Sequence, residues 1–392
     1  MRSNLPWLEK KYVPYPIHDL SLSFNDYREQ CRALITQYRL DLHHHAERII
    51  DSNAPFEFIP LQSLPTMRAE KKYKIGVLLI HGLFDSPATV RDLGQHLQAQ
   101  GMLARSVLLP GHGLYPGCLT TVSHQEWLQS VQYGVHSLSQ AVEQIFLVGY
   151  SMGAMLALQQ ALQHPTIIGV ALLAPSFAMD PIVELLIHAY RGLSWLQNRM
   201  QWLYVDKEID YFRYISVPLN AVQQFNELCQ FTKNLHAQRN LECPVFMACS
   251  MQDEVVSGRA ALEYFQENFP ATQNRCILYS EKTTSFSDAR ITLRPGKYPG
   301  LHIKNISHTA LPIAPTNSYY GKDGDYVHAS RIDKNAIFGA YNKVTVKNLR
   351  WLQRHGILKK HYNELTYNPD FAFLATGISQ FIFDASASAP SA

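Results

Sequence analysis

The chain has 392 residues, 46% of them hydrophobic, and a formal net charge of +3. This length and composition allow a large buried core, which agrees with a soluble enzyme. So small a net charge does not favour nucleic acid as a partner.

Cysteine usage and hydropathy indicate the compartment. None of the six cysteines forms a CxxC pair, which favours a reducing environment over a disulfide framework. Residues 1–7 lack the apolar core of a signal peptide, and no run of 18 apolar residues occurs. We therefore expect a cytoplasmic protein without a transmembrane segment.

The N-terminal region, residues 1–54, is predicted to be a helical extension. Between residues 23 and 51, apolar side chains recur at spacings of three and four, and a short strand is predicted over 56–59. His43, His44 and His45 are consecutive, so on a helix they point in three directions. A solvated face is therefore favoured over a metal site, and no metal is expected.

Strands and helices then alternate. A buried strand is predicted over 73–80, and Ser86-Pro87 provides the N-cap and first residue of a helix. A second strand is predicted over 103–109, and Ser123 with Glu126 forms a capping box that begins the next helix. This alternation predicts an α/β fold with a parallel sheet and crossover helices.

The segment Gly149-Tyr150-Ser151-Met152-Gly153 lies between an apolar run, 144–148, and a helical run, 154–162. A Gly-x-Ser-x-Gly segment between a strand and a helix is typical of a nucleophile elbow, whose tight turn exposes the serine hydroxyl. Side chains at Gly149 or Gly153 would collide with neighbouring backbone. Ser151 is therefore the predicted nucleophile.

Together with His81-Gly82 and Pro110-Gly111-His112-Gly113, this elbow resembles the bacterial carboxylesterase and monoacylglycerol lipase branch of the α/β-hydrolase superfamily, also described as serine aminopeptidase-like hydrolases. The resemblance covers about residues 74–311. It implies an α/β-hydrolase fold, a mostly parallel sheet flanked by helices with an inserted helical cap.

The expected domain organisation follows from that resemblance. The hydrolase domain is predicted over 55–355, with the cap inserted at about 176–242. A C-terminal extension is predicted over 356–392, ending in a disordered tail from Ala385.

The superfamily order of serine, acid and histidine directs the search for the remaining catalytic residues. Asp253 follows a predicted strand over 243–250 and resembles the family's acid, which holds the histidine in one tautomer. Its rivals are the neighbouring Glu254 and Asp180, which follows a predicted strand over 167–174.

Position must identify the base, because the chain has 17 histidines. Residues 301–306 alternate like a strand, and His308 directly follows them, which favours it over His302 inside that strand. His328 is a further candidate. The separation of 55 residues between Asp253 and His308 is long, and 281–299 is interpreted as an inserted loop or hairpin.

The implied chemistry is acyl transfer without a cofactor, in which His308 takes the proton of Ser151 during attack on a carbonyl. The oxyanion would be stabilised by the backbone N–H of Met152 and, by resemblance, that of Leu83. His81 would orient the loop that carries Leu83.

The cap segment is rich in apolar and aromatic residues between 182 and 204, which favours a small-molecule ester or lipid with an apolar acyl chain. No acidic cluster in the cap is evident that would hold a free amine. Two further functions remain open for this chain, a serine peptidase or amidase and a non-catalytic binding protein of the same fold.

The C-terminal region carries fewer signals. Residues 321–325 are rich in turn formers but do not match a calcium-binding loop. Helices are predicted over 335–353 and within 367–383.

Overall fold

The computed structural model describes residues 5–16, 19–42, 45–60, 72–177, 201–281, 287–326, 338–339 and 363–389. The α-helices in these ranges are α1 (Phe24–Tyr38), α2 (Ala46–Asn53), α3 (Arg91–Ala99), α4 (His124–Ala141), α5 (Met152–Gln163), α8 (Leu219–Gln238), α9 (Gly258–Asn268) and α12 (Phe371–Ser388). The strands are β1 (Glu57–Phe58), β2 (Tyr73–Ile80), β3 (Leu103–Ser106), β4 (Val142–Tyr150), β5 (Ile167–Leu173), β6 (Trp202–Tyr204), β7 (Val217–Pro218), β8 (Val245–Ser250), β9 (Arg275–Ser280), β10 (Ile291–Pro295), β11 (Phe338–Gly339) and β12 (Asn363–Glu364). Short 3₁₀ turns are η1 (Pro6–Leu8), η3 (Pro87–Val90), η4 (Pro116–Thr120) and η5 (Pro299–Leu301).

A central eight-stranded sheet has the order β1-β3-β2-β4-β5-β8-β9-β10. All its neighbouring pairs are parallel except β1 with β3. The predicted α/β fold with a mostly parallel sheet is confirmed. The carboxyl ends of its parallel strands all lie at one edge, so loops that follow β2, β4 and β8 meet there.

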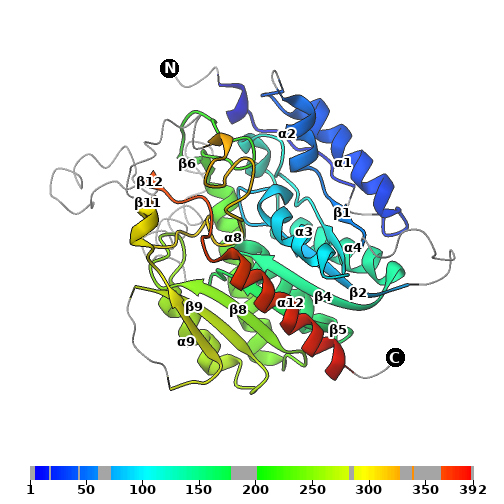
Figure 1. The fold of residues 1–392 in the computed structure, drawn as a ribbon. Helices are drawn as coiled ribbons and strands as arrows, with labels where there is room; N and C mark the ends of the chain where they lie inside the picture. The colour runs from blue at the N-terminus through cyan, green and yellow to red at the C-terminus, as the bar shows by residue number, and fades with distance from the viewer. Residues whose placement is uncertain are drawn as a thin grey trace.

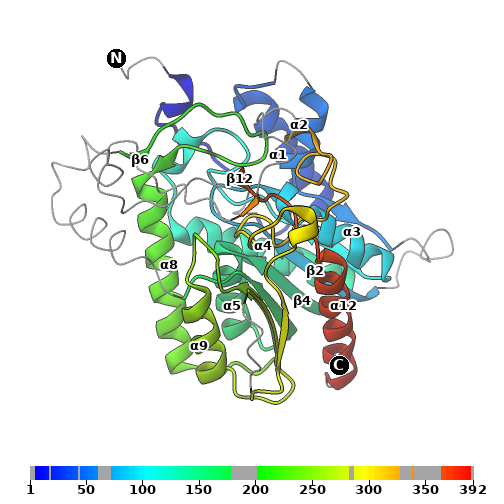
Figure 2. The same ribbon diagram turned by 60° about the vertical axis from the view of Figure 1, so that its left-hand side comes forward.

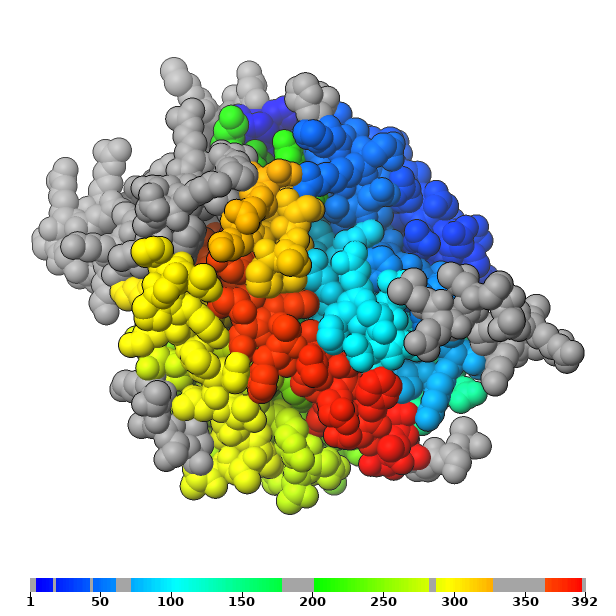
Figure 3. Space-filling view, viewed as in Figure 1, coloured from blue at the N-terminus to red at the C-terminus, as the bar shows by residue number. Residues whose placement is uncertain are grey.

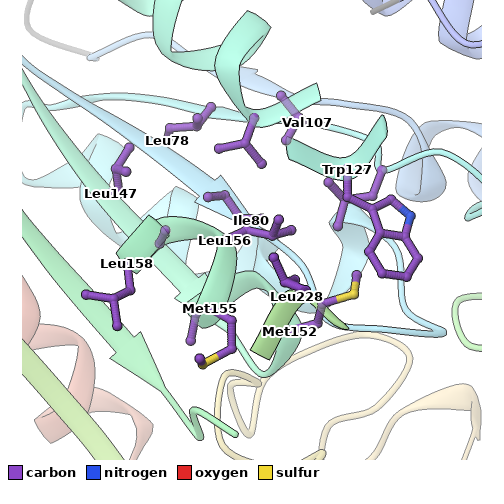
Figure 4. Close-up of a cluster of buried hydrophobic side chains, with 14 of the residues drawn as sticks. Leu78, Ile80, Val107, Trp127, Leu147, Met152, Met155, Leu156, Leu158 and Leu228 are labelled. Carbon is purple, nitrogen blue, oxygen red and sulfur yellow. The ribbon is translucent and has the colours of Figure 1, made fainter. Parts of the chain in front are cut away.

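Helices cover both faces of the sheet, as two views of the ribbon show (Figures 1 and 2). Helices α4, α5, α8 and α9 lie on one face, and α3 and α12 lie on the other. On the first face, Leu78 and Leu147 of the sheet pack among side chains of the surrounding helices, including Trp127 and Leu228 (Figure 4). Burial on both faces explains why these strands read as continuous apolar runs.

The N-terminal helices pack against this core. Tyr27 and Cys31 of α1 are fully buried, and the Tyr27 ring lies 4.6 Å from that of Tyr133 on α4. The Tyr27 hydroxyl accepts a hydrogen bond from the Leu108 N–H at 3.0 Å. The predicted helical region is divided into two helices, and His43 and His44 lie outside the described residues.

The C-terminal helix α12 crosses the second face of the sheet and fills the surface between α3 and the residues around 300 (Figures 1 and 3). The tail predicted to be disordered from Ala385 is instead helical through Ser388, because Ala385 and Ser386 are buried against the sheet side. The helix predicted over 335–353 lies outside the described residues except Phe338–Gly339, which form β11 and pair in parallel with β12.

The strand predicted over 301–306 is wrong. Pro299–Leu301 form η5, and His302 adopts a left-handed conformation with φ 56° that ends any extended run. Only Ile303 and Ile306 of this segment are buried apolar residues. The last strand of the sheet is β10, which lies inside the segment interpreted as an inserted loop and pairs in parallel with β9.

Helix α12 offers a test of how much it contributes to stability. Phe381 is buried, with its ring 5.6 Å from Phe246 and 6.2 Å from Phe146. Replacing it with alanine leaves a cavity and should lower the free energy of unfolding by about 3–5 kcal/mol. Phe383→Ala is the matched control, because Phe383 is 38% exposed on the same helix. If urea unfolding showed equally small losses in the free energy of unfolding for the two variants, Phe381 of α12 would not be part of the core.

Candidate active site

The turn between β4 and α5 places Ser151 at the carboxyl edge of the sheet. Ser151 has φ 56° and ψ −117°, a strained conformation for a residue with a side chain. A Cβ added at Gly149 would lie 2.1 Å from the Gly153 carbonyl oxygen, and one at Gly153 would lie 2.2 Å from the Ile80 carbonyl oxygen. The two glycines are therefore required by close backbone packing, as the elbow motif predicts.

Three loops bring Ser151, His308 and Asp253 into contact. The Nε2 atom of His308 lies 2.9 Å from Ser151 Oγ, and its Nδ1 atom lies 2.8 Å from Asp253 Oδ2. The His308 and Asp253 side chains are 6% and 2% exposed, so water does not compete freely for these contacts. This is the geometry of a nucleophile, a base and a carboxylate that orients the base.

Asp253 and Glu254 hold different parts of the histidine loop. The second carboxylate oxygen of Asp253, Oδ1, accepts hydrogen bonds from the N–H groups of Val255 and Val256 at 2.8 and 2.9 Å. The Glu254 carboxylate instead accepts the backbone N–H of His308, at 3.2 and 3.3 Å. Asp253 is thus the carboxylate that faces the imidazole.

The imidazole that contacts Ser151 belongs to His308, whereas His302 is exposed and follows η5. Asp180 and His328 lie outside the described residues. The carbonyl of His308 accepts a hydrogen bond from the Tyr150 hydroxyl at 3.1 Å, which fixes the histidine loop to the elbow.

Burial and charge set the proton affinities of the site. Burial lowers the pKa of His308, but the neighbouring Asp253 carboxylate outweighs this effect, and the net pKa is raised. Burial, with the charge of Asp253, raises the pKa of Glu254 to about 8. The site therefore holds one carboxyl group, of Asp253, that faces the imidazole and a second, of Glu254, whose pKa is raised and which faces the His308 backbone.

The loop after β2 passes directly beside Ser151. A Cβ added at Gly82 would lie 3.2 Å from Ser151 Cβ, and the next residue is Leu83. The N–H of Met152 belongs to the first turn of α5, where amides lack acceptors within the helix. Both expected oxyanion donors thus belong to segments adjacent to the serine.

His81 holds this loop to the end of β3. Its Nε2 atom accepts the Leu109 N–H at 3.1 Å, which requires the neutral form at that nitrogen. Burial and the adjacent His112 hold the pKa of His81 well below its ordinary value. His81 therefore has a packing role at this loop.

Sequence reasoning missed a buried polar network beside the histidine. Glu364 Oε1 accepts the Thr309 hydroxyl at 2.7 Å and lies 3.1 Å from Arg213 Nη1, and Arg213 Nε lies 3.3 Å from Asp210 Oδ2. Arg213 and Glu364 are 151 residues apart, and neither lies in a recognisable motif. No sequence signal pairs them.

Two acidic residues, Glu208 and Asp210, in the described part of the predicted cap segment already have partners. Asp210 pairs with Arg213 and accepts the Tyr320 hydroxyl at 2.6 Å. The Glu208 carboxylate accepts the N–H groups of Ile215 and Ser216, both at 2.8 Å. Most of the apolar residues predicted to line the cap, 182–200, lie outside the described residues.

The described ranges contain no group of three or more His, Cys, Asp or Glu side chains arranged to hold a metal ion. Within the same ranges, no helix combines the length and the hydropathy needed to cross a membrane.

Residues 71–283, more than half of the chain, match the protein family described as serine aminopeptidase, S33. A thermostable monoacylglycerol lipase from Bacillus sp. (strain H-257) is 34% identical over 96 residues, which cover 24% of this chain and 38% of the lipase. A carboxylesterase from Bacillus subtilis (strain 168) is 25% identical over 201 residues, 49% of this chain and 77% of the esterase.

Solved structures of lipolytic enzymes align with part of this chain at low identity. A monoacylglycerol lipase from Paleococcus ferrophilus is 17% identical, with a TM-score of 0.43, over 58% of this chain and 88% of that chain. A structure from a study of the metagenome-derived lipolytic enzymes LipS and LipT is 19% identical, with a TM-score of 0.46, over 57% of this chain and 86% of that chain.

Proposed function

Because this chain belongs to the serine aminopeptidase, S33, family of hydrolases, we propose that it cleaves carboxylic esters with apolar acyl chains through Ser151, His308 and Asp253. The observation that carries the proposal is the pair of contacts on either side of the His308 ring, 2.9 Å to Ser151 Oγ and 2.8 Å to Asp253 Oδ2. The first contact is made at the strained Ser151 of the elbow, where Gly149 and Gly153 allow the backbone to pack closely.

In the first half-reaction, neutral His308 takes the proton of Ser151 as Oγ attacks the ester carbonyl. The resulting imidazolium is stabilised by Asp253, and the oxyanion by the N–H groups of Leu83 and Met152. The positive end of the α5 dipole favours the same negative charge. The imidazolium then protonates the departing alcohol, which leaves an acyl group on Ser151.

In the second half-reaction, water replaces the alcohol. His308 takes a proton from the water as it attacks the acyl carbonyl, and returns that proton to Ser151 Oγ as the carboxylic acid leaves. The cycle restores the enzyme and needs no cofactor. Asp253 holds the imidazole in place during both steps, because its carboxylate is fixed by the Val255 and Val256 N–H groups and lies 2.8 Å from His308 Nδ1.

Three features support an ester with an apolar acyl chain over an amide. Relatives of the chain are named monoacylglycerol lipase and carboxylesterase. A free α-amine of a peptide substrate would need an available carboxylate, and Glu208 and Asp210 in the described part of the cap region are engaged by backbone and side-chain donors. The partly buried strand β6, Trp202–Tyr204, adds apolar and aromatic surface to this region.

A parallel assay of two substrate series tests the proposal. We expect the full chain to hydrolyse p-nitrophenyl esters between acetate and palmitate with a clear optimum in chain length, since a bounded apolar pocket favours acyl chains that fill it. Aminoacyl p-nitroanilides should react at least about a hundredfold more slowly in kcat/KM. Faster cleavage of an anilide than of every ester would instead assign a peptidase, and inertness toward both series would favour a binding protein.

A further inference from the structure

A buried segment that follows β6 contacts several loops of the active site. We define residues Asp210–Tyr214 as the brace. Asp210, Phe212 and Arg213 within it are at most 7% exposed. The Asp210 carboxylate accepts the N–H groups of Phe212 and Arg213, at 2.9 and 3.3 Å, and so folds the brace into a compact turn.

Arg213 of the brace is linked to the histidine loop through Glu364. Arg213 Nη1 lies 3.1 Å from Glu364 Oε1, and the same carboxylate oxygen accepts the hydroxyl of Thr309 at 2.7 Å. Thr309 directly follows His308. The Ser307 hydroxyl, on the other side of His308, donates to the carbonyl of Leu365, next to Glu364. Glu364 and Leu365 therefore hold both neighbours of the histidine, and the brace holds Glu364 through Arg213.

Tyr214, the last residue of the brace, contacts the loop of the expected oxyanion donor. The Tyr214 N–H donates to the Phe84 carbonyl at 2.8 Å. Phe84 has φ 66°, a left-handed conformation that is unfavourable for an aromatic residue and needs support from its surroundings. This hydrogen bond provides such support one residue after Leu83.

Two residues of the N-terminal region, Arg39 and Asn53, anchor the brace at Tyr211. Arg39, just after α1, donates from Nη2 to the Tyr211 carbonyl at 2.6 Å and from Nη1 to the Gly113 carbonyl at 3.1 Å. Asn53 of α2 donates to the same Tyr211 carbonyl at 3.0 Å. The Arg39 side chain is 4% exposed and pairs with Asp41, so its charge is compensated.

We propose that the brace, set by Arg39 of the N-terminal region, is a positioning element that fixes the histidine loop and the Leu83 loop relative to Ser151. The inference rests on the proposed serine hydrolase function. It gives residues 1–54 a part in catalysis, since Arg39 and Asn53 act through the brace and do not touch substrate. A shift of about 1 Å at either loop would lower the rate of the chemical step by on the order of a hundredfold while leaving the acyl pocket in place.

Two arginine variants of the full chain test the proposal. Arg39→Met removes the anchor. Arg105→Met is the matched control, because Arg105 is 10% exposed, pairs with Glu57 and donates to the Ser137 carbonyl, away from the brace. The measurements are kcat and KM for a p-nitrophenyl ester, the rate of Ser151 phosphonylation by a fluorophosphonate, and the thermal midpoint.

We expect Arg39→Met to lower kcat and the phosphonylation rate at least about tenfold, with KM changed by less than about twofold. Arg105→Met should lower the thermal midpoint comparably and keep both rates within about twofold of wild type. Equal kinetic losses in the two variants would overturn the proposal, because the loss would then follow stability alone.

A second pair of variants keeps the test decisive if Arg39→Met does not fold. Thr309→Val removes the hydroxyl that contacts Glu364 and should also lower kcat about tenfold at unchanged KM, whereas Thr309→Ser should retain wild-type kcat. Wild-type rates in Thr309→Val would overturn the proposal that the brace positions the histidine loop. If the wild-type chain neither hydrolysed esters nor reacted with the fluorophosphonate, the proposed function itself would be wrong. The results for the variants test only the role of the brace.

Discussion

Replacing Ser151 with alanine is expected to lower kcat for p-nitrophenyl ester hydrolysis by on the order of 10⁵- to 10⁶-fold. The proposed mechanism forms a covalent acyl group on Ser151 Oγ, 2.9 Å from the base, and the variant has no atom at that position. Residual turnover would come from water attack on an ester held by the oxyanion donors. Turnover at high enzyme concentration, with the substrate blank subtracted, measures the loss.

The variant should fold normally, since alanine bears the same backbone strain at φ 56° as serine. Ser130→Ala is the control for loss of a buried serine hydroxyl. Ser130 lies on α4, and its Oγ donates to the Leu108 carbonyl at 3.1 Å. Its stability should fall by about 0.5–1.5 kcal/mol with kcat almost unchanged. If Ser151→Ala retained wild-type turnover, the elbow would not carry the nucleophile and the proposed mechanism would be wrong.

Sequence patterns predict the structure correctly where local chemistry determines it. The predicted strand over 73–80 coincides with β2, because a strand buried on both faces is apolar throughout and is bounded by polar residues. The elbow was equally recognisable, since Gly149 and Gly153 lie where backbone atoms approach within 2.2 Å of a would-be Cβ. The capping box at Ser123 and Glu126 is also present, with the Glu126 carboxylate accepting the Ser123 N–H.

Prediction failed where burial is set by distant partners. The edge strand β10 is only partly buried and contains an arginine and a proline, so it lacks the apolar pattern of an interior strand. The segment 301–306 has the opposite property: Ile303 and Ile306 are buried and separated by polar residues, which imitates strand alternation in an irregular loop. The two contacts of His308 depend on how that loop returns to β4, which no local pattern encodes.

The second large effect on kcat is expected from the neighbouring acidic residues Asp253 and Glu254. Asp253→Asn is expected to lower kcat by on the order of 10⁴-fold, because an amide that donates to His308 Nδ1 favours the tautomer with a proton on Nε2. That tautomer cannot accept the Ser151 proton. Glu254→Gln should lower kcat at pH 7 by less than about tenfold, since its amide oxygen can still accept the His308 backbone N–H. Steady-state kinetics of the two variants measure the difference.

The pH dependence of kcat/KM distinguishes the roles of Asp253 and Glu254 further. Neutral His308 is the base, so kcat/KM should rise with pH through the raised pKa of His308. Glu254 is protonated below its pKa of about 8 and ionised above it, which adds a negative charge beside His308 and should produce a second inflection there. Glutamine cannot ionise, so this inflection should disappear in Glu254→Gln while the lower one remains. If the inflection near pH 8 persisted in that variant, it would belong to another group. If Glu254→Gln lost as much activity as Asp253→Asn, Asp253 could not be assigned as the carboxylate that orients the base.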